Sequence, residues 1–76
     1  MVTPLLLGMK ESSSSNKAEQ LLSDAGIRFR YQDILTKDSR VAEMMQAISG
    51  SYEVPQLFVG GDSYVGIEQI RRYIGS

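Results

Sequence analysis

The sequence contains neither cysteine nor histidine. Without cysteine the chain cannot build a disulfide scaffold, and without either residue it lacks the ligands of the usual zinc sites. The absence of histidine also removes the commonest general base near neutral pH. We therefore expect no metal site and no resident cofactor.

Strong charge and long apolar runs are also missing. The formal net charge is −1, and the basic residues are scattered, which argues against a nucleic-acid surface or a polybasic membrane surface. The apolar run from Pro4 to Met9 is too short to span a membrane, and no basic segment or small-residue cleavage site surrounds it. These features favour a soluble, cytoplasmic, monomeric protein without a nucleic-acid or membrane partner.

What the chain does contain is typical of a small globular domain. Of its 76 residues, 42% are hydrophobic and 22% are charged, which are ordinary values for a folded protein. A chain of this length buries only about 60–65% of its unfolded surface. We therefore expect one domain, residues 1–76, with a thin margin of stability.

The first half of the chain predicts a strand, a helix and a second strand. Residues 5–9 form a continuous apolar run, typical of a strand buried on both faces. Asn16 and Glu19 form a capping-box-like helix start, although any of the four preceding serines could cap the helix instead. The helix ends at Gly26, and residues 28–34 alternate polar and aromatic side chains as a half-exposed strand does. The apolar stripe of this helix consists of Ala18, Leu21, Leu22 and Ala25.

The second half predicts a helix, a hairpin and a last helix. A polar connection at 36–39 offers capping residues, and the helix after it stops at Gly50. Residues 56–59 and 63–65 form a hairpin around the turn at 60–62. The apolar stripe of the first helix consists of Val41, Met44, Met45 and Ile48, with both methionines as core residues. The last helix places Ile67, Ile70 and Ile74 inward and Arg71 and Arg72 outward.

The predicted element order is therefore βαβαββα. The first half forms a parallel βαβ unit with a right-handed crossover, and the hairpin must join it in the antiparallel sense. A four-stranded mixed sheet with helices on both faces buries every apolar stripe. The fold class is α/β.

The Val54–Pro55 bend organises this fold. Proline has no N–H to donate to a strand ladder, so it precedes the strand at 56–59 instead of lying within it. We expect the Val54–Pro55 peptide bond to be cis, with main-chain groups turned outward beside it. The loop at 10–15 faces this bend, and we expect Tyr52 and Tyr64 to flank the groove between them.

The element order and two motifs resemble the glutaredoxin family, the small form of the thioredoxin fold. Residues 54–61, Val-Pro-Gln-Leu-Phe-Val-Gly-Gly, are similar to the family's motif around its cis-proline. Residues 12–22 occupy the place of the family's Cys-x-x-Cys motif and the start of the helix that contains it. Aligning that helix puts Ser12 and Ser15 where the family has its two catalytic cysteines.

Serine at these positions changes the chemistry that the resemblance implies. A helix N-terminus lowers the pKa of a cysteine thiol, and the thiolate attacks disulfides through a mixed disulfide. The hydroxyls of Ser12 and Ser15 stay protonated and form no S–S bond, so the chain is predicted to be redox-silent. A nucleophilic serine would need an oriented base, and only Lys10 lies nearby, so a helix-capping role is favoured.

The resemblance also implies a glutathione site. Lys10 matches the lysine that faces the glycyl carboxylate in the family, but it lies one residue closer to Ser12 than usual, and a solvated lysine is an equal alternative. The main-chain groups of Val54, beside Pro55, would pair with the cysteinyl part of the peptide. The position before them, commonly threonine in the family, is Glu53.

A third segment matches the part of the family's site that holds the γ-glutamyl end of glutathione. It consists of Gly66, Ile67 and Glu68, with one glycine fewer than the family's pattern. A plain helix start followed by a core residue explains Gly66 and Ile67 equally well.

Two functions fit these features. The first is a glutaredoxin-like binding or adaptor domain, with a small thiol peptide such as glutathione or a protein partner at the Val54–Pro55 groove. The shortened loop favours it, because replacing cysteines would not delete a residue. The second is the Cys-to-Ser form of a thiol-disulfide oxidoreductase that depends on glutathione or on a thioredoxin reductase, with cysteines originally at positions 12 and 15.

Overall fold

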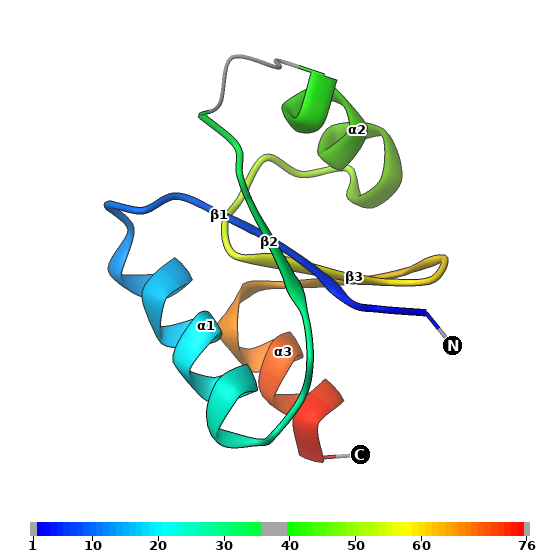
Figure 1. The fold of residues 1–76 in the computed structure, drawn as a ribbon. Coiled ribbons are helices and arrows are strands. Elements are labelled where there is room, and N and C mark those ends of the chain that lie inside the picture. The colour runs from blue at the N-terminus through cyan, green and yellow to red at the C-terminus, as the bar shows by residue number, and fades with distance from the viewer. Residues whose placement is uncertain (1, 36–39, 76) are drawn as a thin grey trace.

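The computed structural model describes residues 2–35 and 40–75, so the predicted polar connection at 36–39 lies outside the described residues. The elements follow one another in the predicted βαβαββα order (Figure 1). The strands are β1 (Leu5–Gly8), β2 (Arg30–Asp33), β3 (Gln56–Val59) and β4 (Asp62–Val65). The helices are α1 (Ser13–Asp24), α2 (Arg40–Ser49) and α3 (Gly66–Gly75).

The four strands form one mixed sheet in the order β2-β1-β3-β4. β1 is parallel to β2 and antiparallel to β3, and β4 returns antiparallel to β3. Helices α1 and α3 lie together on one face of the sheet, and α2 lies on the other (Figure 1). The predicted four-stranded sheet with helices on both faces is therefore confirmed.

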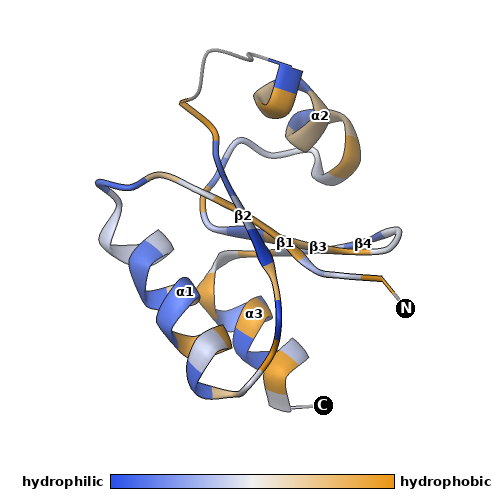
Figure 2. Ribbon diagram, in the orientation of Figure 1, coloured by the Kyte–Doolittle hydropathy of each residue, from blue (hydrophilic) through white to orange (hydrophobic). Residues whose placement is uncertain are grey.

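The core has two parts, one on each face of the sheet. Leu6 of β1 belongs to the larger cluster under α1 and α3, and its neighbour Leu7 belongs to the smaller cluster under α2. Because successive strand residues point to opposite faces, a strand covered on both sides is apolar throughout, as β1 is. Figure 2 shows hydrophobic segments interspersed with hydrophilic ones along α1 and α3, as expected of helices that bury one side.

Helix α1 begins earlier than the Asn16 capping box would place it. Ser12 is the N-cap, and its Oγ accepts a hydrogen bond from the Ser15 N–H at 3.2 Å. Asn16 instead donates its side-chain amide to the Lys10 carbonyl at 3.2 Å. At the other end, Ala25 is an exposed C-cap residue and not part of the apolar stripe, because the helix has already ended there.

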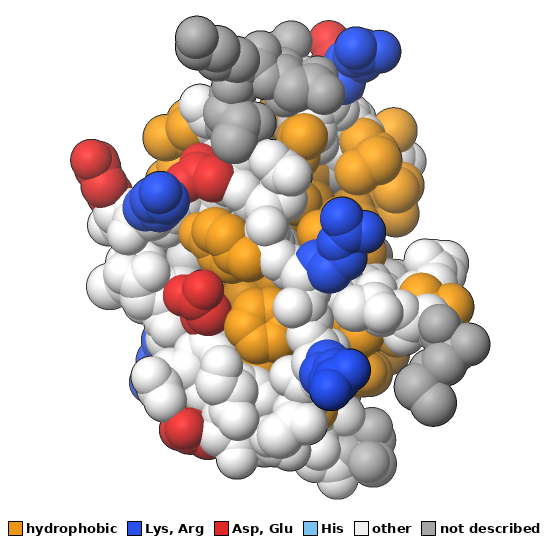
Figure 3. All heavy atoms as spheres, in the orientation of Figure 1, with side chains coloured by type: hydrophobic (Ala, Val, Ile, Leu, Met, Phe, Trp, Pro, Cys, Tyr) orange, Lys and Arg blue, Asp and Glu red, His pale blue; other side chains and the backbone are white. Residues whose placement is uncertain are grey.

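Helix α2 is less buried than its sequence pattern predicts. Met45 is fully buried, but Met44 is 41% exposed and Ile48 is 51% exposed, so the prediction that both methionines are core residues is wrong for Met44. Within the described part of the chain, α2 lies alone on its face of the sheet (Figure 1). Only one narrow side of it can be covered, and Figure 3 shows hydrophobic side chains at the surface over this helix.

A glycine allows α1 to approach β1 closely. A Cβ placed on Gly8 would lie 2.8 Å from both Cβ and Oγ of Ser15 and 3.3 Å from the Tyr31 hydroxyl. The Tyr31 hydroxyl is buried and has no hydrogen-bond partner among the described residues. Desolvation, with smaller contributions from the charges of Asp33 and Glu19, raises the pKa of Tyr31 above its ordinary value.

The two neighbouring methionines of α2 provide a test of this packing. Met45→Asp should unfold the domain, because a buried carboxylate without a partner costs more than about 4 kcal/mol. Met44→Asp should stay folded and lose less than about 1 kcal/mol, because its side chain already meets water. Urea unfolding followed by circular dichroism distinguishes them. Equal midpoints for the two variants would contradict the assigned orientation of α2.

Tyr31→Phe tests the unpaired hydroxyl. At pH 7 the variant should be as stable as the parent or more stable by up to about 1 kcal/mol, because a buried group without a partner is removed. The parent should then lose stability relative to the variant as the pH rises above 10.0, the pKa of the unfolded tyrosine, because the folded state resists ionisation. Thermal unfolding between pH 7 and pH 11 measures this, with Tyr52→Phe as the exposed control. Parallel curves for parent and variant would contradict the raised pKa.

Candidate functional site

The strand register brings three chain segments to one edge of the sheet. Gln56, the first residue of β3, lies between Leu7 of β1 and Val65 of β4. β1 and β4 therefore end where β3 begins. Because α1 follows β1 and α3 follows β4 directly, both helices start at this same edge, to the left in Figure 1.

The Val54–Pro55 segment lies at this edge. Its peptide bond is cis. Pro55 is buried, and its carbonyl accepts a hydrogen bond from the Gly66 N–H at 2.9 Å. The Val54 side chain packs against the smaller core cluster, but neither its N–H nor its C=O has a hydrogen-bond partner within residues 2–35 and 40–75. The two main-chain groups of Val54 thus have no partner and lie beside a residue that the fold holds in place.

The loop before this segment is held by its own side chains. The Ser49 hydroxyl donates to the Met45 carbonyl at 2.8 Å, and its oxygen accepts from the Ser51 N–H at 3.3 Å. The Ser51 hydroxyl oxygen in turn accepts from the Glu53 N–H at 3.0 Å. These bonds connect the end of α2 to the residue before Val54 and fix the path of the chain into the site.

The tip of α1 is the second component of the site. Ser12 is half-exposed, whereas Ser15 is fully buried and its Oγ accepts a hydrogen bond from the Met9 N–H at 3.1 Å. The N–H groups of Ser13 and Ser14 have no hydrogen-bond partner among the described residues. Free N–H groups at the positive end of a helix dipole favour an anion. The helix tip is therefore suited to an anion. Of the two predicted catalytic positions, Ser12 faces the surface and Ser15 faces the interior.

Lys10 lies in the loop that leads to this tip. Its side chain is exposed, and its main chain is fixed by a hydrogen bond from its N–H to Asp33 Oδ2 at 3.2 Å and by the bond that its carbonyl accepts from Asn16. A lysine held in this way can contribute positive charge near the helix tip. Both interpretations of Lys10, as a ligand-facing residue and as a solvated lysine, are compatible with this position.

The third predicted segment begins α3. Gly66 has a positive φ of 86° and donates to the Pro55 carbonyl. The Ile67 side chain packs against the larger core cluster, while its N–H has no hydrogen-bond partner among the described residues. Glu68 is exposed in the first turn. Ile67 can thus act as a core residue through its side chain and still offer its N–H to a ligand.

The two tyrosines expected beside the groove occupy different environments. Tyr52 is 60% exposed and lies two residues before Val54. Tyr64 pairs with Leu57 on the face of α1 and α3, and its ring lies 5.1 Å from the ring of Tyr73. The expectation is therefore wrong for Tyr64, because the pleat of β4 turns this side chain toward α3.

One residue of the site was not singled out in the sequence. Gln56 is fully buried, and its Nε2 donates to the carbonyls of Ser51 at 2.9 Å and Glu53 at 2.8 Å. The available signal was a polar residue directly after proline in an otherwise apolar strand. Strand periodicity cannot show that its partners are loop carbonyls, because these lie three and five residues earlier in the chain.

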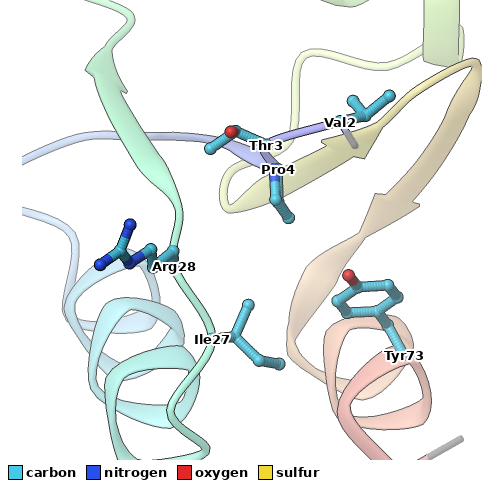
Figure 4. Close-up of a pocket in the computed structure, with 6 residues that line it drawn as sticks. All are labelled: Val2, Thr3, Pro4, Ile27, Arg28 and Tyr73. Carbon is cyan, nitrogen blue, oxygen red and sulfur yellow. The ribbon is translucent and has the colours of Figure 1, made fainter.

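Two cavities lie away from this edge. One of about 470 Å³ is lined by residues from the start of the chain, from the connection between α1 and β2, and from α3. It lies at the opposite end of β1 from the site. Figure 4 shows the Tyr73 hydroxyl pointing toward Pro4 across it.

In the part of the chain that the structure describes, no group of three or more Asp and Glu residues could hold a metal ion. None of the helices in this part has the length and apolarity needed to cross a membrane.

Solved structures share this architecture. A glutaredoxin from Archaeoglobus fulgidus superimposes with a TM-score of 0.86 at 24% sequence identity, over 100% of this chain and 89% of that one. A buckwheat glutaredoxin in complex with glutathione gives a TM-score of 0.81 at 14% identity, over 93% of this chain and 66% of that one. At these identities the likeness establishes the fold alone.

The sequence comparisons identify the family. The glutaredoxin family model matches residues 13–64. The hybrid peroxiredoxin hyPrx5 of Haemophilus influenzae is 39% identical over 57 residues, which are 75% of this chain and 23% of that protein. The chain thus spans about a quarter of the length of this relative. It belongs to the glutaredoxin family, as a member without cysteine.

Proposed function

We propose that this protein is a redox-inactive binding or adaptor domain that holds a small thiol peptide or a segment of a partner protein at the Val54–Pro55 edge. The observation that carries the proposal is the unpartnered peptide unit of Val54 beside buried Pro55. An extended peptide can pair with such main-chain groups as an added strand does. This kind of recognition does not require sulfur.

The absence of sulfur separates binding from the chemistry of the family. Disulfide exchange requires a thiolate as the attacking group, and this chain has no cysteine. The Ser12 oxygen already caps α1, and the Ser15 oxygen already accepts from Met9. Both hydroxyls therefore stabilise the binding surface.

Glutathione is the first ligand to consider. Its carboxylates fit the free N–H groups at the tip of α1 and the charge of Lys10, and its cysteinyl peptide unit fits Val54. The N–H of Ile67 offers a further donor. A structurally similar buckwheat glutaredoxin was solved as a complex with glutathione, which supports this choice.

A chemical-shift titration with reduced glutathione tests the proposal. The backbone amide signals of Ser13, Val54 and Ile67 should shift together along one saturable curve, because one ligand would contact all three segments. Triglycine, which has a similar main chain but lacks the γ-glutamyl and thiol groups, should bind more weakly. If no saturable shift occurs up to about 10 mM peptide, binding is weaker than roughly −3 kcal/mol, and glutathione is excluded as the ligand.

The second candidate function is that of an oxidoreductase in its Cys-to-Ser form. A half-exposed Ser12 followed by a buried Ser15 has the arrangement of an attacking and a resolving thiol. The Haemophilus influenzae relative is a hybrid peroxiredoxin, which supports this candidate. This candidate differs from the first only in the native residues at the two positions.

Restoring both thiols tests this second candidate. On the adaptor proposal, Ser12→Cys/Ser15→Cys should show no disulfide reduction above that of the serine protein, because the loop after Lys10 is one residue short of the family's pattern. The assay is insulin or mixed-disulfide reduction coupled to glutathione or to a thioredoxin reductase. Ser13→Cys/Ser14→Cys serves as the control with misplaced thiols. Turnover by the first variant and not by the control would favour the oxidoreductase.

A further inference from the structure

Gln56 is a buried polar residue at the start of β3, an inner strand of the sheet. It is fully buried, and it is flanked by the carboxyl ends of β1 and β4 through Leu7 and Val65. It directly follows Pro55, so it is the first residue after the bend to be held by the sheet. Its side chain shares the α2 face with Leu7, because paired residues of neighbouring strands point to the same side.

Only the nitrogen of the Gln56 side-chain amide makes hydrogen bonds within the described residues. Its two N–H bonds go to the carbonyls of Ser51 and Glu53, at 2.9 Å and 2.8 Å. Its Oε1 is buried and has no hydrogen-bond partner among the described residues. Two carbonyl acceptors around one nitrogen determine the orientation of the amide, since the opposite orientation would place oxygen against oxygen.

Packing alone does not explain a glutamine at this position. A buried carbonyl oxygen without a donor is unfavourable, and an apolar side chain of the same volume would avoid that penalty. The strand continues with Leu57 and Phe58, both in the core, so an apolar residue would suit the pattern. What glutamine adds is the pair of donors, and both of them end on the loop that carries Val54.

We propose that Gln56 is a positioning residue that fixes the 51–53 loop and thereby presents the peptide unit of Val54. It acts through Val54 and does not itself contact the ligand. Ser49 and Ser51 hold the start of the loop, and Gln56 holds its end from inside the sheet. The consequence for affinity rests on the proposed function, whereas the effect on the loop does not.

Gln56→Met tests the proposal in the whole chain. Methionine preserves the length and volume of the side chain but removes both donors. The backbone amide signals of Glu53 and Val54 should shift. Hydrogen exchange of the Ser51 and Glu53 N–H groups, which are bonded to the Ser49 and Ser51 hydroxyls, should become at least about tenfold faster. Reduced glutathione should bind about tenfold more weakly. Gln20→Met, which removes an exposed amide that donates to Asp24 on α1, should change neither property.

Gln56→Glu adds a pH readout that a purely structural role would not produce. When protonated, the new carboxyl group can donate one hydrogen bond to the Ser51 or Glu53 carbonyl, and when ionised it faces both carbonyls with negative charge. The Val54 amide signal should therefore approach its parental position at low pH and move away as the pH rises. The parent protein, recorded over the same pH range, corrects for pH effects that do not come from the new carboxyl group.

The outcomes separate this proposal from the proposed function. If the Val54 signal and the Glu53 exchange rate of Gln56→Met equal those of the parent, Gln56 does not position the loop and the inference is overturned. If they change and glutathione binds neither protein, the positioning role holds while the proposed ligand fails. If Val54 is perturbed but glutathione binds both proteins equally, the inference that Gln56 presents a ligand-binding peptide unit is overturned.

Discussion

The antiparallel insertion of β3 beside β1 is the constraint on which the rest of the structure depends. Because of it, β3 starts beside the end of β1, and Gln56 lies between Leu7 and Val65. The start of α1 and the start of α3 are consequently brought to the same edge (Figure 1). A shift of this register by one residue would turn the core side chains of β3 to the wrong faces, so the site is as firmly specified as the core.

The edge formed in this way belongs to a glutaredoxin-family fold without the cysteines that disulfide exchange needs. Serine preserves the helix cap and the interior hydrogen bond that fix the tip of α1, so the loss of a thiol need not disturb the fold. The open peptide unit of Val54 depends on the main chain and is therefore insensitive to the substitutions at positions 12 and 15. The substitutions at positions 12 and 15 thus remove the thiols while leaving the main-chain groups of this edge in place.

The sequence predicted the element order, the sheet and the bend because these follow from apolar periodicity and from glycine and proline positions. It misjudged Met44 and Ile48, since a helical stripe shows which residues can be buried but not how wide the opposing surface is. It also left the start of α1 open, because several consecutive serines can each cap a helix. The role of Gln56 could not be predicted, because its partners are loop carbonyls whose positions only the folded chain defines.

The distribution of buried polar groups provides a last argument for the location of the site. In the described part of the chain, the fully buried polar residues are Ser15 and Gln56, and both lie at the edge where β1 ends and β3 begins. The unpaired Tyr31 hydroxyl lies next to Ser15, above Gly8. Polar burial weakens a small domain with a thin margin of stability. Its concentration at one edge, in a core that is otherwise apolar, is the pattern expected where a functional site and not the fold determines the choice of residues.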